Sequence, residues 1–340
     1  MQKEITIYDI AKTLKLSPAT VSRALKGDKV VSFNTRSIIA AKATEMGYRH
    51  NKFASSLRQR KTQTIGVLVH TLKSNFITSV LAGIEEVTSE AGYDIIIAHS
   101  SENYEREVAN ALNLFHKRVD GVVASLSFTT KNLDHFKCFF EKGIPVIFFD
   151  RAEENSDHTH VIIDNYKCGY RATNHLAEQG CKRIVLFTAD LTRNVYSERF
   201  RGYKDALAEA GIAYDEKLVI IKDLSEQSAI ETALEILKMR PVPDAVFCTN
   251  DFIGAICMNE LISQGIKVPE DIAIVGFNND PIGKIVKPQL TTIDYPGNIM
   301  GEVTARSLIN HLLGFGKLSE TNRIIVKSEL IVRGSSLRKK

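Results

Sequence analysis

The sequence predicts an α/β protein in two parts: a small N-terminal head of three short helices, and a larger body of two lobes built on parallel sheets. Residues 1–62 contain 13 Lys or Arg and 4 Asp or Glu, a net charge of +9, whereas the rest of the chain is at −5. Helix start and stop signals follow one another closely up to Tyr48. From Thr64 onward, short apolar runs alternate with amphipathic stretches. The length of 340 residues suits two or three domains.

The pattern of residues 6–48 predicts the three helices of the head. The first begins at Thr6 with a Thr-x-x-Asp capping box, followed by apolar residues at helical spacing. Ser17 is a good N-cap for the second helix, because Pro18 suits the first helical position, where no N–H is needed. Ser32 caps the third, and a glycine follows each of the two later helices.

Two short helices joined by a tight turn form a helix-turn-helix, whose second helix can enter the DNA major groove. Arg23 can bond guanine O6 and N7 with two donors. The short polar side chains suited to phosphate contacts are Ser17, Thr20, Ser22 and Asn34. A small bundle that binds protein, or a basic solvated surface without a partner, are the alternatives, and the charge and the polar face of the second helix favour DNA.

The body is expected to contain two series of parallel strands separated by helices, for example helices over 76–91 and 103–118. Because ligands bind beyond the carboxyl ends of such strands, two lobes predict a ligand cleft between them. The expected strands are Ile65–Val69, Asp94–Ala98, Gly121–Ala124 and Pro145–Phe149 in the first series, and Arg183–Phe187, Leu218–Ile221, Ala245–Cys248 and Ile272–Gly276 in the second.

Several kinds of protein are not expected from this sequence. It contains no GxGxxG, no phosphate-binding P-loop and no GxSxG or Cys/His catalytic signature, so we expect neither an enzyme nor a cofactor. His158 and His160 lie in a polar stretch, 151–160, that is expected to be a surface loop, and His175-x-x-Glu178 lacks the HExxH spacing of a zinc site. We therefore expect no metal.

The sequence also indicates where the protein resides. Five scattered cysteines suit a reduced interior, no apolar run reaches membrane-spanning length, and the N-terminus lacks a secretory signal. A cytoplasmic protein without a membrane partner is expected.

Residues 6–48, TIYDIAKTLKLSPATVSRALKGDKVVSFNTRSIIAAKATEMGY, closely resemble the headpiece of LacI/GalR-type bacterial transcription regulators. The resemblance continues to Ser336 through motifs such as RVDGVVAS (118–125), GIPVIFFDR (143–151) and VPEDIAIVGFNND (268–280). It implies DNA contacts by head residues Thr6, Tyr8, Ser17, Pro18, Ala19, Thr20, Ser22, Arg23 and Asn34.

The basic segment after Tyr48 is similar to the hinge helix of that family, which orders on the operator. Asn51, Ala54 and Leu57 match its N-x-x-A-x-x-L spacing, which makes Leu57 the expected minor-groove wedge and places Arg58 for a phosphate. His50 stands where the family usually has proline. A plain solvated linker is the alternative interpretation.

The resemblance implies a head (1–50), a hinge (51–62) and a core (63–340) like that of periplasmic sugar-binding proteins. The chain of such a core crosses between its lobes three times, and we expect the crossings near Ile162–Asp164, Thr291–Asp294 and Val326–Glu329. The expected lobes are 63–161 with 293–326, and 164–291 with 329–340.

The family's effector positions fall on Phe76, Ser125, Asp150, Arg193, Arg199, Asn250 and Asn278. Asn278 replaces a usual aspartate, and this removes a negative charge while two arginines remain. A ligand with a carboxylate or phosphate is therefore expected, and a neutral sugar is the alternative.

These features together predict a homodimeric repressor that binds a near-palindromic operator in double-stranded DNA and responds to a small-molecule effector. The alternatives of another class are a pure binding protein whose head no longer binds DNA, and an enzyme that uses the cleft. Intact Arg23 and Leu57 argue against the first, and Asp150 alone supplies no catalytic pair for the second.

Overall fold

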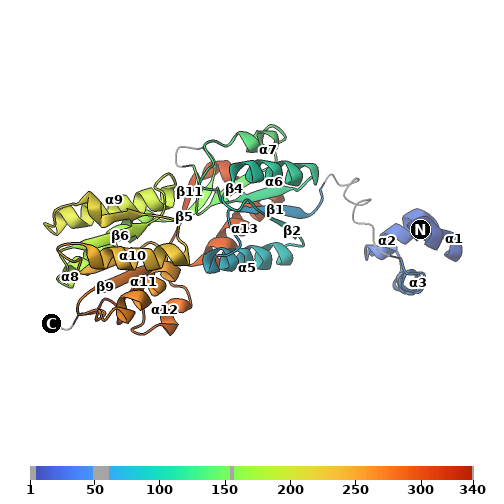
Figure 1. Ribbon diagram of the computed structural model, residues 1–340. Helices are drawn as coiled ribbons and strands as arrows, with labels where there is room; N and C mark the ends of the chain where they lie inside the picture. Colours follow the sequence, from blue (N-terminus) through green and yellow to red (C-terminus); the bar gives the residue numbers. More distant parts are fainter. Residues whose placement is uncertain (1–4, 49–60, 154–156, 339–340) are drawn as a thin grey trace. The chain divides into compact units, whose positions relative to one another are not determined.

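The computed structural model describes residues 5–48, 61–153 and 157–338, which fall into two compact units, residues 1–62 and 63–340 (Figure 1). The described part of the first unit is a three-helix head. Its helices pack on one another around the fully buried Ile10, Val21 and Ile39. They are α1 (Ile7–Leu14), α2 (Pro18–Leu25) and α3 (Phe33–Glu45).

Each helix of the head starts with the cap that its sequence predicts. The backbone N–H and the hydroxyl of Thr6 donate to the Asp9 carboxylate over 2.9 and 2.7 Å, which closes the capping box. Ser17 Oγ accepts the Thr20 N–H at 3.1 Å, and Ser32 Oγ accepts the Thr35 N–H at 3.2 Å. The two serine caps satisfy backbone donors that a helix start leaves unpaired, so they fix where α2 and α3 begin.

The first lobe of the second unit is a six-stranded, all-parallel sheet in the order β11-β5-β4-β3-β1-β2. Helices α5 and α13 cover one face of the sheet, while α6 and α7 cover the other (Figure 1). The strands are β1 (Thr64–Val69), β2 (Asp94–His99), β3 (Gly121–Ala124), β4 (Val146–Phe149), β5 (His160–Ile163) and β11 (Arg323–Val326). The helices are α5 (Asn75–Glu90), α6 (Tyr104–His116), α7 (Lys137–Glu141) and α13 (Gly297–Leu313).

The second lobe repeats this plan with a sheet in the order β12-β10-β9-β8-β6-β7, in which the short β12 alone is antiparallel among the described strands. Helices α8 and α9 cover one face, and α10 and α11 the other. The strands are β6 (Ile184–Thr188), β7 (Val219–Ile221), β8 (Ala245–Cys248), β9 (Ala273–Asn278), β10 (Thr291–Asp294) and β12 (Leu330–Ile331). The helices are α8 (Asn165–Glu178), α9 (Asn194–Glu209), α10 (Glu226–Lys238), α11 (Asp251–Ser263) and the short α12 (Ile282–Ile285).

The predicted fold class is confirmed, with two α/β lobes on parallel sheets. The chain leaves the first lobe after β5, returns to it between β10 and α13, and leaves it again between β11 and β12. Because β10 continues in the second sheet to Asp294, the return lies slightly later than the expected start at 293.

The expectation of a surface loop over 151–160 was wrong at both ends of the stretch. Arg151 and Ala152 are buried after β4, and Thr159 and His160 are buried at the start of β5. Polar composition suggested exposure here, but the buried polar groups have partners. Thr159 Oγ1, for example, donates to the Leu318 carbonyl at 2.5 Å.

Helices α8 and α9 approach each other closely, and this fixes the start of α9 at the cleft. A Cβ on Gly169 would lie 2.2 Å from the Arg199 carbonyl oxygen, and one on Gly202 would lie 2.1 Å from the Tyr166 carbonyl oxygen. Only glycine permits backbones to pack at this distance, so the two glycines set the position of the arginines that α9 carries.

Among the described helices, none combines the length and the apolar character that a membrane span requires. Within the same residues, no group of three or more His, Cys, Asp or Glu side chains is arranged to hold a metal ion. All five cysteines are free thiols.

Candidate functional site

The head presents one face of α2 to solvent. Ala19, Arg23 and Lys26 are exposed at helical spacing, whereas Val21 and Ala24 face the core of the head. This exposed face thus carries two basic side chains, as expected of a helix that enters a major groove.

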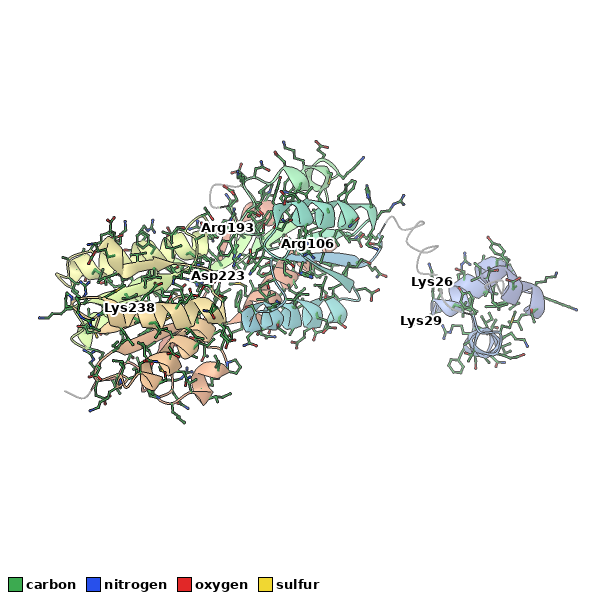
Figure 2. The ribbon with its side chains drawn as sticks, in the orientation of Figure 1. Lys26, Lys29, Arg106, Arg193, Asp223 and Lys238 are labelled. Atoms are coloured by element: carbon green, nitrogen blue, oxygen red, sulfur yellow. The ribbon has the colours of Figure 1, made fainter. Side chains whose placement is uncertain are left out.

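The basic side chains of the head divide into paired and unpaired ones. Lys42 forms an ion pair with Glu45 at 2.6 Å, and the Arg36 guanidinium donates to the Gly27 and Asp28 carbonyls. Lys26 and Lys29 project from the head without an ion-pair partner among the described residues (Figure 2). Such unpaired lysines are available to phosphates.

The remaining predicted DNA contacts lie mostly at the surface of the head. Thr6, Ser17 and Asn34 are exposed, Tyr8 is 67% exposed, and Pro18, Thr20 and Ser22 are half-buried. Asn51, Ala54, Leu57 and Arg58 lie outside the described residues, as does His50, so the hinge stays a prediction. Two apolar side chains that the sequence did not single out, Val30 and Phe33, are 78% and 80% exposed beside the cap Ser32. Apolar residues next to the helix cap Ser32 were the signal in the sequence that could have drawn attention to this exposed surface.

In the core, polar side chains converge where β1, β3 and β4 end. His70 Nδ1 lies 3.0 Å from Ser125 Oγ, and Ser125 Oγ donates to Asp150 Oδ2 at 3.5 Å. Tyr295, which follows β10 of the other lobe, donates its hydroxyl to Asp150 Oδ1 at 2.6 Å. Phe76 stacks on Tyr295 with ring centroids 4.0 Å apart. The inner cleft thus joins both lobes through Tyr295.

Burial governs the charges of this inner cleft. It lowers the pKa of His70 well below its usual value, with the positive charge of Arg151 adding to the effect, so the imidazole is neutral. Burial also raises the pKa of Asp150, although Arg151, Tyr295 and Arg199 oppose that shift. The ionised form of Asp150 is therefore disfavoured by burial and favoured by these three neighbouring side chains.

Arg199 is held rigidly within the second lobe. Its Nε donates to Asn165 Oδ1 at 2.9 Å, its Nη1 donates to the Thr249 carbonyl at 3.1 Å, and its guanidinium lies 3.5 Å from the Phe277 ring centroid. No carboxylate of the described residues forms an ion pair with it. Arg199 is thus a fixed cation whose charge is not neutralised by direct contact.

Asn250 and Asn278 mainly shape the backbone around the cleft. Asn250 Oδ1 caps α11 by accepting the Phe252 and Ile253 N–H groups. Asn278 ends β9 with a φ of +117° and donates to Asp280 Oδ2 at 3.4 Å. Asn278 thus turns its amide toward an acidic neighbour, and burial raises the pKa of that Asp280 carboxyl.

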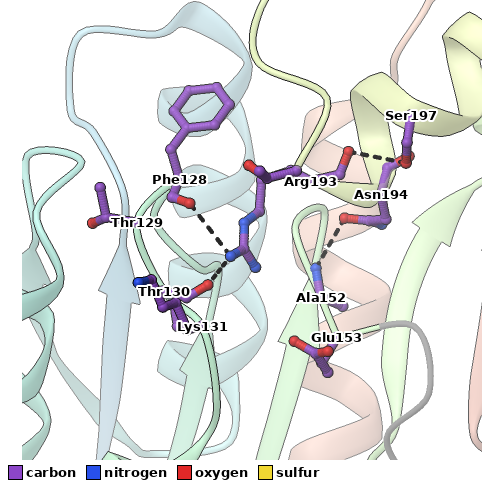
Figure 3. Close-up of a pocket in the computed structure, with 10 residues that line it drawn as sticks. Phe128, Thr129, Thr130, Lys131, Ala152, Glu153, Arg193, Asn194 and Ser197 are labelled. Atoms are coloured by element: carbon purple, nitrogen blue, oxygen red, sulfur yellow. Dashed lines mark hydrogen bonds between the residues drawn. The ribbon is translucent and has the colours of Figure 1, made fainter.

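A pocket of about 480 Å³ opens between the lobes beside this inner cleft (Figure 3). Arg193 lies 6% exposed on its wall and reaches from the start of α9 to the Phe128 and Thr130 carbonyls of the first lobe. Its Nε is buried without a hydrogen-bond partner, and burial lowers the pKa of the guanidinium. The lining residues are Phe128, Thr129, Thr130, Lys131, Ala152, Glu153, Thr192, Arg193, Asn194 and Ser197.

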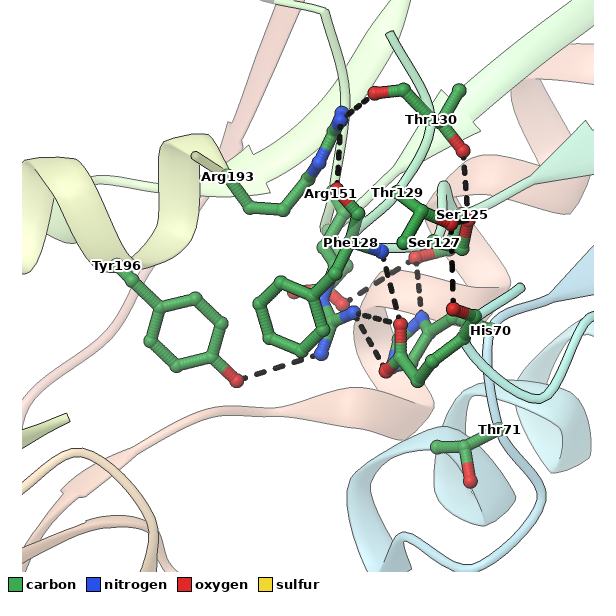
Figure 4. A network of polar contacts seen from close by, with 12 residues as sticks. His70, Thr71, Ser125, Ser127, Phe128, Thr129, Thr130, Arg151, Arg193 and Tyr196 are labelled. Carbon is green, nitrogen blue, oxygen red and sulfur yellow. Dashed lines mark hydrogen bonds and ion pairs between the residues drawn. The ribbon is translucent and has the colours of Figure 1, made fainter. Parts of the chain in front are cut away.

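Of the predicted effector residues, Arg193 is the one found among the described residues that line this pocket. Phe76, Ser125, Asp150 and Arg199 lie in the inner cleft instead. Arg151 and Tyr196, which were not predicted, stand beside the pocket's Phe128 (Figure 4), and Glu102, also not predicted, accepts the Phe128 N–H. Arg151 was missed because its stretch was interpreted as an exposed loop, although it lies two residues after the carboxyl end of the buried strand β4.

A helix-turn-helix head joined to a two-lobed core with a pocket at its strand ends defines a class of protein, a ligand-responsive DNA-binding regulator. Residues 6–51 match the family of bacterial regulatory proteins, lacI family. Residues 62–331 match the periplasmic binding proteins and sugar-binding domain of the LacI family. The chain belongs to the LacI family.

Individual relatives agree with this assignment. The HTH-type transcriptional regulator RegA of Clostridium saccharobutylicum is 32% identical over 98% of this chain and 99% of its own length. The HTH-type transcriptional repressor PurR of Vibrio atlanticus (strain LGP32) is 31% identical over 90% and 92%, respectively. Among solved structures, a complex of the transcriptional regulator CelR with cellobiose is 28% identical, covers 98% of this chain and 100% of its own, and has a TM-score of 0.73. These relatives are transcription regulators and not enzymes.

Proposed function

We propose that this regulator is a homodimeric repressor of a near-palindromic operator, controlled by a small molecule that carries an anionic group and binds between the lobes. Two heads related by a two-fold axis would contact two half-sites, as the symmetry of such operators requires. The effector would change operator affinity through its different affinities for two arrangements of the lobes.

The observation that carries the ligand class is Arg193. Its Nε is a buried donor without a partner, and such a donor favours a ligand acceptor that restores the missing bond. An ionised carboxylate or phosphate forms the stronger, charge-assisted bond to a guanidinium. Lys131 adds a second cation to the wall, and Glu153 adds one anion.

A neutral sugar is the second candidate ligand. The hydroxyls of Thr129, Thr192 and Ser197 line the same pocket and suit sugar hydroxyls. The cellobiose bound by CelR, a neutral sugar, also supports this alternative.

The DNA part of the proposal is tested by selecting an operator from random DNA with the full chain, and then measuring the affinity of variants. We expect Arg23→Ala to weaken binding to the selected site by about tenfold to a hundredfold, the value of one bidentate guanine contact, and to relax base preference at one position. Non-specific, salt-dependent binding should persist.

Lys42→Ala is the matched control, because it removes the same charge from a residue already paired with Glu45. Its discrimination between bases should equal that of the wild type. If Arg23→Ala discriminates as well as Lys42→Ala, Arg23 does not contact the bases.

A further inference from the structure

The segment after β3, residues 127–130 and here called the β3 loop, is held by two glutamates of its own lobe. The Ser127 N–H and the Thr130 hydroxyl donate to the fully buried carboxylate of Glu107, both over 2.7 Å. The Phe128 N–H donates to Glu102 Oε2 at 3.0 Å. The loop therefore has a fixed shape set by acidic side chains outside it.

Glu102 carries this role from a strained backbone. Ser101 and Glu102 have φ values of +52° and +59°, the left-handed region that non-glycine residues rarely adopt. Such strain persists only where surrounding contacts hold it, and it often marks a functional position. Here the Glu102 N–H donates to the His70 carbonyl at 3.1 Å, and both carboxylate oxygens accept Arg151 Nη1, at 2.8 and 2.9 Å.

Arg151 extends this pair to the other lobe (Figure 4). Its buried guanidinium lies 4.1 Å from the Phe128 ring centroid and donates from Nη2 to the Tyr196 hydroxyl at 3.5 Å. The Phe128 and Tyr196 rings stack with centroids 5.5 Å apart. Phe128 belongs to the first lobe and Tyr196 to the first turn of α9, so the stack joins the two lobes.

The same turn of α9 makes two further bridges to the first lobe. Arg193 donates to the Phe128 and Thr130 carbonyls. Asn194 donates to the Asp150 carbonyl at 3.1 Å and accepts the Ala152 N–H at 3.2 Å. Every one of these bridges ends on the β3 loop or on the segment around Arg151, the two parts that Glu102 holds together.

We propose that Glu102 and Arg151 form an interlobe lock, a pair of positioning residues that holds Phe128 against Tyr196 and thereby keeps the lobes closed over the pocket. The significance of the pocket rests on the proposed function, whereas the lock rests on the contacts between the lobes. Because Glu102 neutralises the charge of Arg151, Arg151 positions the pocket wall and does not bind the anionic group of a ligand. Arg193 is the arginine that binds such a group in the proposed function.

The test is hydrogen–deuterium exchange of the full chain without DNA or ligand, comparing the wild type with Glu102→Gln and Arg151→Lys. A local role of Glu102 would change exchange only at Phe128, whose N–H it accepts. The lock predicts that these first-lobe changes also speed exchange in the second lobe, at the Tyr196 and Ser197 amides that bond the Arg193 carbonyl. We expect at least about tenfold faster exchange there, since exchange reports local opening.

Glu235→Gln is the matched control, because it removes an exposed ion pair of the second lobe, Lys222–Glu235 at 2.7 Å, away from the cleft. It should leave exchange at Tyr196 and Ser197 unchanged. Arg151→Lys keeps the charge, and Glu102 is one-third exposed, so both variants are expected to fold, which circular dichroism checks. Unchanged exchange at Tyr196 and Ser197 in both folded variants overturns the lock. Because no DNA or effector is present, this outcome is independent of whether the proposed function holds.

Discussion

At the scale of single residues, the three arginines of the cleft differ in what neutralises them. Arg151 is paired with Glu102, whereas Arg193 and Arg199 donate to carbonyl and amide oxygens, which carry no full charge. A buried cation without a carboxylate partner is costly unless something else compensates it. The nearby charge of Glu153 offsets part of this cost at Arg193, and in the proposed function an anionic effector would supply the rest.

Asp251 offers a test of the electrostatics beside the cleft. Its carboxylate is buried and accepts the Asp280 N–H and the Thr292 hydroxyl, both at 2.7 Å. Burial, with the nearby charge of Asp280, raises the pKa of Asp251 to about 7. The folded protein therefore holds a proton that the unfolded chain releases above pH 4, so this group's contribution to stability is present at low pH and is lost as the pH rises toward 7.

Between pH 5 and 7, we expect the free energy of unfolding of the wild type to fall by about 1 kcal/mol per pH unit relative to that of Asp251→Asn. Urea unfolding of both proteins at each pH measures this difference, in which the titration of groups that do not interact with Asp251, such as His70, cancels. Parallel stability profiles for the two proteins would show that Asp251 titrates normally.

Single residues also show where prediction from the sequence succeeded and where it failed. The head caps at Thr6, Ser17 and Ser32 were predictable because a cap depends on neighbours a few residues away. Arg151 was not, because its partners Glu102 and Tyr196 are distant in the sequence and local composition suggested exposure. Long-range pairing decides such positions, and spacing along the chain does not reveal it.

At the scale of elements, the packing of α8 on α9 sets the position of Arg193 and Arg199, the two cleft arginines of the second lobe. A Cβ on Gly202 would lie 2.1 Å from the Tyr166 carbonyl oxygen and 2.5 Å from the Tyr170 nitrogen, both of which are backbone atoms that cannot rotate away. The helices would have to separate to admit it.

We expect Gly202→Ala to destabilise the fold by about 1–3 kcal/mol, the usual cost of overpacking. Gly316→Ala is the control, because nothing lies within 4 Å of its added Cβ. Chemical denaturation measures both, and equal stability of the two variants would contradict the close helix contact.

The central strands of each lobe were predictable as short apolar runs, because β1, β3, β6 and β8 are buried on both faces of a parallel sheet. The strands next to the points where the chain crosses between the lobes were not predictable in this way. β11 is partly exposed, with the burial pattern of an edge strand, and β10 contains the polar pair Thr291 and Thr292, buried because their hydroxyls bond Arg333 and Asp251. Tertiary partners, rather than hydrophobic pattern, make these segments strands.

At the scale of the whole molecule, the charges divide between the two units, with +9 in residues 1–62 and −5 in the remainder. A basic head attracts the DNA backbone, and an acidic body is not drawn to it. In the proposed function, specificity would fall to the exposed face of α2, and control of binding to the pocket between the lobes. The two tasks would then be served by separate units of one chain.

The central claim, that an anionic small molecule binds between the lobes at Arg193, is tested most directly by thermal unfolding of the full chain with sugar phosphates, sugar acids, purines and neutral sugars. We expect an anionic compound at a hundred times its Kd to raise Tm by several degrees, since it adds about 2.7 kcal/mol. The shift should disappear in Arg193→Gln and persist in Arg201→Gln, an exposed arginine of the same helix paired with Glu198. A shift with neutral sugars alone, or one that survives in Arg193→Gln, would contradict the claim.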